Sequence, residues 1–257
     1  MIQYLVILLD DTSTPYCHCT NYKRESKLIS LENLKSAIFF AMKENLMIQY
    51  VLPEYELPIE YKEVMNSIDS HLIVSSTCED RNATDAADVI VFDNWTGLDY
   101  WNFDKGQSYV LRTTKEDYFD RYLILKVAFE KASRISVVFT DVDTFTDTDF
   151  DAYKQTLEVL SLSIVKEYAK GHYVQFNLLT DRMLLKEMNS CGAADSNITL
   201  APNGKFYVCP AFYYDGVCDG TEVSLGDVCQ KGFSIGSLRE GLDIKNSHLY
   251  KLDHAPL

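Results

Sequence analysis

The chain has 257 residues, and its 24 Lys and Arg against 38 Asp and Glu give 24 − 38 = −14 at neutral pH. Hydrophobic residues make up 47% of it and charged residues 24%, which is typical of a globular protein and excludes disordered, collagen-like and coiled-coil classes. The negative charge argues against a nucleic-acid partner, because a duplex backbone repels a surface of its own sign. No apolar run approaches the ~18 residues of a membrane helix, so we expect no membrane partner.

Alternating strands and helices are predicted along the first 180 residues or so. The apolar run 2–9 predicts a buried strand rather than a signal peptide, because Asp10-Asp11 ends it and no basic residue precedes it. Further strands are expected at 47–52, 71–75, 88–92, 108–111, 135–140 and 172–179, and helices at 31–45, 61–70, 114–132 and 149–170. This order predicts the α/β class, with a parallel sheet that is either open or an incomplete barrel.

The composition changes near residue 189, after which the chain is richer in Gly and Cys. Two short strands, 197–200 and 205–209, flank the turn signal Pro202-Asn203-Gly204, which predicts a β-hairpin. We therefore expect an α/β domain over residues 1–188 and a small Cys-containing domain over residues 189–257.

The seven cysteines are an odd number in a chain for which we expect no export signal. This favours thiols or metal ligands in the cytoplasm over a disulfide framework. Cys17 and Cys19 follow the first predicted strand, where α/β folds place catalytic groups. In an extended loop both side chains point the same way, with His18 turned away. A metal-bound or reactive Cys17 and two ordinary reduced thiols both remain open.

Cys191 and Cys209 lie on either side of the predicted hairpin, so their thiolates can converge on one metal ion or cluster. Soft thiolate ligands select zinc, copper(I) or iron–sulfur centres, although a cysteine is also a small core hydrophobe. A zinc-dependent hydrolase built on the Cys-His-Cys loop is a further alternative. The chain lacks a Glu at the spacing that such an enzyme uses for its base.

The order of these parts resembles that of radical S-adenosylmethionine (radical SAM) enzymes with a C-terminal SPASM domain. Cys191, Gly204 and Cys209 match the opening half of the SPASM pattern, together with "NGKFYVCPAF" and the later "SIGSLREG". The start "LVILLDDTSTPYCHCTNY" resembles that of CXXX-repeat peptide maturases. The resemblance implies a partial (β/α) barrel with a SPASM-like C-terminal domain, a 4Fe–4S iron–sulfur cluster, S-adenosyl-L-methionine as cofactor and a ribosomally made precursor peptide as partner.

The resemblance also assigns the cysteines. Cys17 and Cys19 become the catalytic, cluster-binding residues, and Cys191 and Cys209 become metal ligands of an auxiliary site. The family motif is Cys-x3-Cys-x2-Cys, and matching Cys17 to its last cysteine leaves only that position as Cys.

The other two motif positions fall on Asp10 and Thr14. The loop after the second strand is Gly-rich in the family, so that its backbone can approach the cofactor, and here it carries Glu54 and no glycine. Asp10, Thr14 and Glu54 are therefore our candidates for the cofactor side of the site.

Two functions follow from the resemblance. The first is a radical SAM/SPASM-like maturase that modifies a ribosomally made peptide by hydrogen abstraction. The alternative is a catalytically inactive relative that binds precursor peptide for a partner enzyme, which the residues at positions 10 and 14 favour. The family's remaining SPASM cysteines would begin about where this chain ends, so we expect that domain to be cut short.

Overall fold

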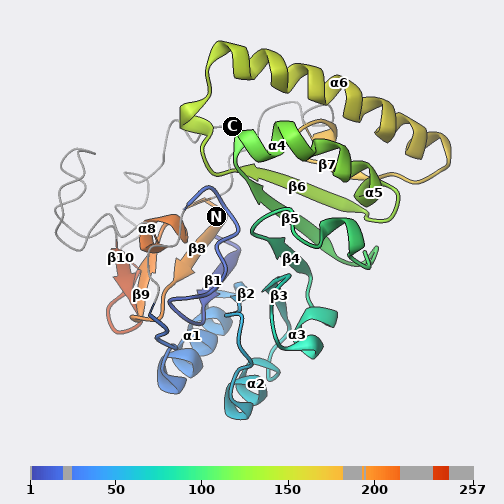
Figure 1. Cartoon of the computed structure of the whole chain (residues 1–257). Coiled ribbons are helices and arrows are strands. Elements are labelled where there is room, and N and C mark those ends of the chain that lie inside the picture. Colours follow the sequence, from blue (N-terminus) through green and yellow to red (C-terminus); the bar gives the residue numbers. More distant parts are fainter. Residues whose placement is uncertain (1, 20–24, 182–192, 194, 215–233, 243–257) are drawn as a thin grey trace.

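The computed structural model describes residues 2–19, 25–181, 193, 195–214 and 234–242. Their strands form one sheet in the order β11-β10-β9-β8-β1-β2-β3-β4-β5-β6-β7 (Figure 1). The strands are β1 (Tyr4–Leu8), β2 (Met47–Val51), β3 (Ser70–Ser75), β4 (Val89–Phe92), β5 (Ser108–Thr113), β6 (Arg134–Phe139), β7 (Gln175–Phe176), β8 (Asn197–Leu200), β9 (Lys205–Tyr207), β10 (Ser234–Ser237) and β11 (Gly241–Leu242). The α-helices are α1 (Leu31–Glu44), α2 (Ile59–Met65), α3 (Arg81–Asp85), α4 (Lys115–Arg121), α5 (Leu125–Phe129), α6 (Asp147–Ala169) and α8 (Ala211–Tyr214). Short 3-10 turns are η1 (Leu98–Tyr100), η2 (Tyr122–Ile124) and η3 (Val142–Thr144).

Strands β1 to β7 run parallel, each beside the next in sequence, and β8 joins the other side of β1 in parallel. Strands β9, β10 and β11 continue the sheet in antiparallel order. Helices α1 to α6 pack along the outside of the curved sheet (Figure 1). The structure confirms the predicted α/β fold with a partial barrel.

Local sequence signals set the helix starts. The Ser30 side chain caps α1 by accepting from the Asn33 amide, and Thr114 caps α4 in the same way. Thr146 and Asp149 form a reciprocal capping box at the start of α6. Each cap satisfies an amide that has no partner inside the helix, so the sequence positions of these starts are well defined.

Two predicted elements were too long. The helix expected over 114–132 is divided into α4, η2 and α5. The strand expected over 172–179 is only Gln175–Phe176, because side chains take over the backbone bonds after it. The side-chain amide of Asn177 accepts from the backbone N–H of Val137 and donates to its carbonyl. Thr180 Oγ1 accepts from the backbone N–H of Phe176 at 2.7 Å.

The sheet separates two apolar clusters. The outer one lies between sheet and helices and includes Leu5, Ile7 and Tyr50. The inner one contains alternate residues of the same strands, including Val6 and Leu8. Burial on both faces explains why the parallel strands read as continuous apolar runs.

The hairpin predicted at 197–209 is present, with β8 and β9 paired across the turn at Gly204. Gly204 has φ 77°, a left-handed conformation that favours glycine. Because β8 hydrogen-bonds to β1, the hairpin extends the barrel sheet. The domain boundary near residue 189 lies outside the described residues and stays a prediction.

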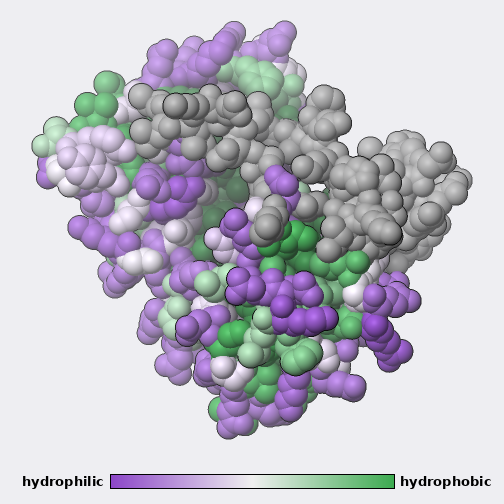
Figure 2. Space-filling model, turned by 180° about the vertical axis from the view of Figure 1, so that it is seen from behind, coloured by the Kyte–Doolittle hydropathy of each residue, from purple (hydrophilic) through white to green (hydrophobic). Residues whose placement is uncertain are grey.

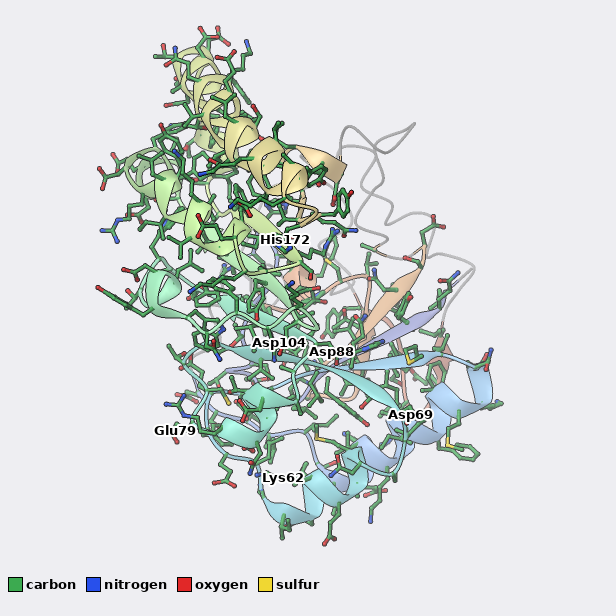
Figure 3. The ribbon with its side chains drawn as sticks, turned by 90° about the vertical axis from the view of Figure 1, so that its right-hand side faces the viewer. Lys62, Asp69, Glu79, Asp88, Asp104 and His172 are labelled. Atoms are coloured by element: carbon green, nitrogen blue, oxygen red, sulfur yellow. The ribbon has the colours of Figure 1, made fainter. Side chains whose placement is uncertain are left out.

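Polar residues also mark the amino ends of the strands. Asp69, Asp88 and Asp104 each precede a strand, and they lie along one edge of the sheet (Figure 3). Asp88 is fixed there by His71 Nδ1 at 2.9 Å and by the Leu72 amide at 2.8 Å. The opposite edge, where the strands end, is therefore the one on which α/β folds place their sites.

On the face seen from behind, hydrophobic residues gather near the centre, among hydrophilic residues that cover much of the rest (Figure 2). No helix in the described part of the chain is long and apolar enough to cross a membrane.

Candidate functional site at the carboxyl end of the sheet

The loop that follows β1 begins with Asp10, which is completely buried. Its Oδ1 accepts hydrogen bonds from the Thr12 amide at 2.8 Å and the Thr12 hydroxyl at 2.5 Å. Its Oδ2 accepts from the hydroxyls of Ser26 and Tyr55, both at 3.0 Å. A buried carboxylate needs such donors, and here both oxygens are already occupied by the protein.

The next residues tie the loop to β2. Ser13 Oγ accepts from the Asp10 amide at 3.0 Å and donates to the Val51 carbonyl at 2.9 Å. The Thr14 amide donates to the Leu52 carbonyl at 3.4 Å, and the Thr14 side chain is buried. Positions 10 and 14, where the family places two cluster cysteines, are thus part of the packed connection between two strands.

Further along the loop, the structure brings Cys17 and Cys19 together. Their Sγ atoms are 3.3 Å apart, and both are thiols rather than disulfide-bonded residues. Cys19 is buried at 4% exposure, while Cys17 is partly exposed. The expectation that these two side chains point the same way is confirmed by this contact.

Arg112, the fifth residue of β5, holds this part of the loop. Its Nε donates to the Cys17 carbonyl at 3.1 Å, and one terminal nitrogen donates to the Cys19 carbonyl. Its other terminal nitrogen forms an ion pair with Asp93, which follows β4. The guanidinium is a planar set of five donors, so one buried side chain can fix three acceptors from two loops.

Glu54 follows β2 at the same edge. One of its carboxylate oxygens accepts from Ser75 Oγ at 3.1 Å and from the Thr77 hydroxyl, which join it to the end of β3. The loop that is Gly-rich in the family is therefore held by side-chain hydrogen bonds in this chain.

His18 lies between the two cysteines in sequence, and its Nδ1 is 2.8 Å from the Phe139 carbonyl at the end of β6. A carbonyl only accepts, so Nδ1 carries the hydrogen in this contact. With Arg112, this bond connects the first loop to the two strands on the far side of the sheet.

Four tyrosines pack around the thiols. Tyr207, Tyr213 and Tyr214 belong to the inner cluster that contains Cys19, and Tyr16 packs against it. The Tyr213 hydroxyl donates to Asp11, which ties α8 to the first loop. Complete burial raises the pKa of Tyr214, and its hydroxyl has no hydrogen-bond partner among the described residues.

Metal ligation was the main prediction for the cysteines. Among the residues that the structure describes, no group of three or more His, Cys, Asp or Glu side chains is placed to hold a metal ion. Cys209 follows β9 and does not complete such a group with Cys17 and Cys19, and Cys191 lies outside the described residues. The described residues therefore do not fit the three-thiolate site of a radical SAM cluster, and metal binding at the four cysteines stays a prediction.

The sequence analysis missed three residues of the site: Arg112, Tyr55, which binds Asp10, and Tyr213, which binds Asp11. Arg112 sits in the otherwise apolar run "YVLRTT", and a charged residue that ends a buried strand is the signal that could have singled it out. The packing of Tyr213 and Tyr214 against the first loop was not predicted either.

The fold can be compared with known proteins. Among solved structures, the chain is similar to native anSMEcpe with bound AdoMet and Cp18Cys peptide, at a TM-score of 0.57 and 11% identity, over 95% of this chain and 79% of that one. It is also similar to SuiB of Streptococcus suis bound to precursor peptide SuiA, at a TM-score of 0.47 and 10% identity, over 89% of this chain and 64% of that one. No protein-family model and no curated protein matches the chain. The chain thus shares the fold of anSMEcpe.

Proposed function

We propose that this chain acts in the maturation of a ribosomally made peptide, in the cytoplasm, by binding the precursor peptide for a partner enzyme. The observation that carries the proposal is the likeness of fold to anSMEcpe, a protein solved with AdoMet and a peptide, over 95% of the chain. The sequence resemblance to CXXX-repeat peptide maturases supports the same class of partner.

Three contacts favour peptide binding over radical chemistry. Asp10 and Thr14 are packed into the β1–β2 connection and offer no thiolate for a cluster. Arg112 is occupied by two main-chain carbonyls and Asp93, so its charge is already neutralised by the protein. Glu54 replaces the glycines that would let the backbone approach S-adenosyl-L-methionine.

Partly exposed aromatic residues, Tyr16 and Phe212, pack against the buried tyrosines of the inner face and are suited to a peptide. The tilted rings of Tyr207 and Tyr213 pack with centroids 5.2 Å apart, beside Tyr16 and Phe212. Aromatic rings that carry a polar hydroxyl combine apolar contact area with hydrogen bonding, which suits side chains of mixed character.

Peptide binding can be measured directly on the purified full-length protein. The probes are fluorescein-labelled synthetic peptides translated from the short reading frames that flank the gene, followed by fluorescence anisotropy. We expect saturable binding of one of them, weakened about tenfold by Tyr16→Ala, because loss of one aromatic contact costs on the order of 1.4 kcal/mol or more. Tyr173→Ala, at a tyrosine that is 70% exposed between α6 and β7, should bind as the wild type does. If none of the peptides binds, the proposal is wrong.

The second candidate is an active iron–sulfur maturase, which the approach of Cys17 and Cys19 at the carboxyl end of β1 favours. It is tested by anaerobic reconstitution with iron and sulfide, followed by an assay for 5′-deoxyadenosine in the presence of S-adenosyl-L-methionine and a reductant. The peptide-binding proposal expects no product above that of the Cys17→Ala variant. Product formation that depends on Cys17 would establish the active maturase instead.

A further inference from the structure

Two thiols in this chain are placed for chemistry that needs no metal. Cys17 Sγ and Cys19 Sγ are 3.3 Å apart, with a single residue between them in sequence. A disulfide bond is ~2.05 Å long, so the two sulfur atoms need to approach by only about 1.3 Å. We propose that Cys17 and Cys19 form a thiol–disulfide exchange site whose substrate is a low-molecular-weight disulfide.

The backbone around the pair is already fixed. Arg112 donates to the carbonyl oxygens of both cysteines, so one buried guanidinium sets the positions of both residues. Closing the bridge then requires rotation of two side chains rather than ordering of a loop, which keeps its entropic cost small.

The two thiols differ in access, and this assigns their order of reaction. Cys17 is partly exposed and can meet a small disulfide, while Cys19 is buried at 4% exposure, with its Sγ 3.3 Å from that of Cys17. A third thiol provides a comparison. Cys78 is buried apart from them against the Pro53 carbonyl, and burial raises its pKa, which keeps it in the unreactive protonated form.

The exchange balances as follows. The Cys17 thiolate attacks one sulfur atom of a small disulfide RSSR, forms a mixed disulfide and releases RS⁻. The Cys19 thiolate then attacks Cys17 Sγ, forms the Cys17–Cys19 bond and releases the second RS⁻. The two protons that left the cysteine thiols produce two RSH, so the protein is oxidised by two electrons and the small disulfide is reduced by two.

An independent observation lies beside the pair. The Tyr214 hydroxyl is completely buried in the same cluster as Cys19 and has no hydrogen-bond partner among the described residues. Burying a hydroxyl without a hydrogen bond costs free energy, and a thiolate is an acceptor that can bind it. Cys19 belongs to this cluster and Cys17 packs against it, so thiolates formed during exchange would be acceptors in the cluster.

The test uses full-length wild-type protein, dialysed against a chelator so that bound metal does not shield the thiols. It is reduced, desalted and incubated anaerobically with oxidised glutathione, then quenched with acid, alkylated with N-ethylmaleimide, digested and analysed by mass spectrometry. We expect the segment with Cys17 and Cys19 to lose two hydrogens and to carry neither glutathione nor maleimide. Reduction with dithiothreitol should restore two alkylation sites.

Single variants resolve the order. Cys19→Ser should accumulate glutathione on Cys17, and Cys17→Ser should slow oxidation at Cys19 by about tenfold or more, because buried thiols react slowly. Cys78→Ser should behave as the wild type. The proposal is overturned if wild-type Cys17 and Cys19 are both alkylated, carry glutathione separately, or bridge to other cysteines. None of these readouts uses a precursor peptide or S-adenosyl-L-methionine, so this inference stands or fails apart from the proposed function.

Discussion

The hydroxyl of Tyr55 donates a hydrogen bond of 3.0 Å to Oδ2 of Asp10, and this contact joins the loop after β2 to the loop after β1. Ser26 donates to the same oxygen, and the two donors of Thr12 occupy the other. A residue at a position where the family places a cluster cysteine thus serves as the acceptor that holds three segments together.

Replacing Asp10 with Asn should therefore destabilise the fold. The amide nitrogen that replaces one carboxylate oxygen cannot accept the hydrogen bonds that this oxygen now receives, and the charge that strengthens these hydrogen bonds is lost. We expect the free energy of unfolding to fall by about 2–4 kcal/mol, measured by urea denaturation followed by circular dichroism. Asp69→Asn, at an exposed residue before β3, should change it by less than ~0.5 kcal/mol. An equally small change for Asp10→Asn would contradict the structural role.

Arg112 should be as important for stability as Asp10. Arg112→Gln leaves the carbonyls of Cys17 and Cys19 without their donors and Asp93 without its partner. We expect a loss of about 3 kcal/mol in the free energy of unfolding, since the guanidinium is 5% exposed.

The matched control for Arg112 is Arg121→Gln. Arg121 lies at the end of α4, half exposed, with carboxylate contacts of 3.8 and 3.9 Å. Surface ion pairs of this kind contribute ~0–1 kcal/mol, so the variant should unfold almost as the wild type does. If the two variants lose the same stability, the clamp on the first loop is not supported.

The fold was predictable because its signals are local. Runs such as 4–9 and 89–92 are apolar throughout, as strands buried on both faces must be, and Ser30, Thr114 and Thr146 mark helix starts by their capping chemistry. The place of Cys17 and Cys19 was predictable for a related reason, since the carboxyl ends of parallel strands lie on one edge of the sheet.

The contacts that organise the site were not predictable in this way. Arg112 and Cys17 are 95 positions apart, and nothing in either local pattern indicates that one holds the other. Asp10 reads in sequence as the polar end of a strand, and its burial depends on Tyr55, 45 positions away. The strand expected at 172–179 was too long, because the Asn177 side chain replaces the backbone pairing after Phe176, which an apolar pattern does not indicate.

Two buried tyrosines make a matched pair for a test of hydrogen-bond satisfaction. The Tyr50 hydroxyl is buried under the outer helices with no partner among the described residues, and burial raises its pKa. The Tyr109 hydroxyl accepts from the Asp104 amide at 2.6 Å and is 3.0 Å from Gln107 Oε1. We expect Tyr50→Phe to raise the free energy of unfolding by about 1 kcal/mol, and Tyr109→Phe to lower it by a similar amount. Thermal melts of the three proteins check this, and a loss of stability in Tyr50→Phe would show that its hydroxyl is satisfied.

The stability of α6 should depend on pH in the acid range. The hydrogen bond from Lys115 Nζ, at 2.8 Å, and those from Thr146 lower the pKa of Asp149 to about 2. Since the unfolded chain has the ordinary value of ~3.9, the stabilisation is fully present above about pH 4 and is lost as the pH falls towards 2.

In Asp149→Asn this contribution is absent at every pH, so the variant should lose less stability than the wild type between pH 5 and pH 2. Urea midpoints at both pH values measure the difference, with Asp151→Asn as the control, because Asp151 is 72% exposed and pairs with the equally exposed Lys154 at 3.2 Å. Equal acid losses in the wild type and Asp149→Asn would show that the capping box and the Lys115 pair do not anchor this helix.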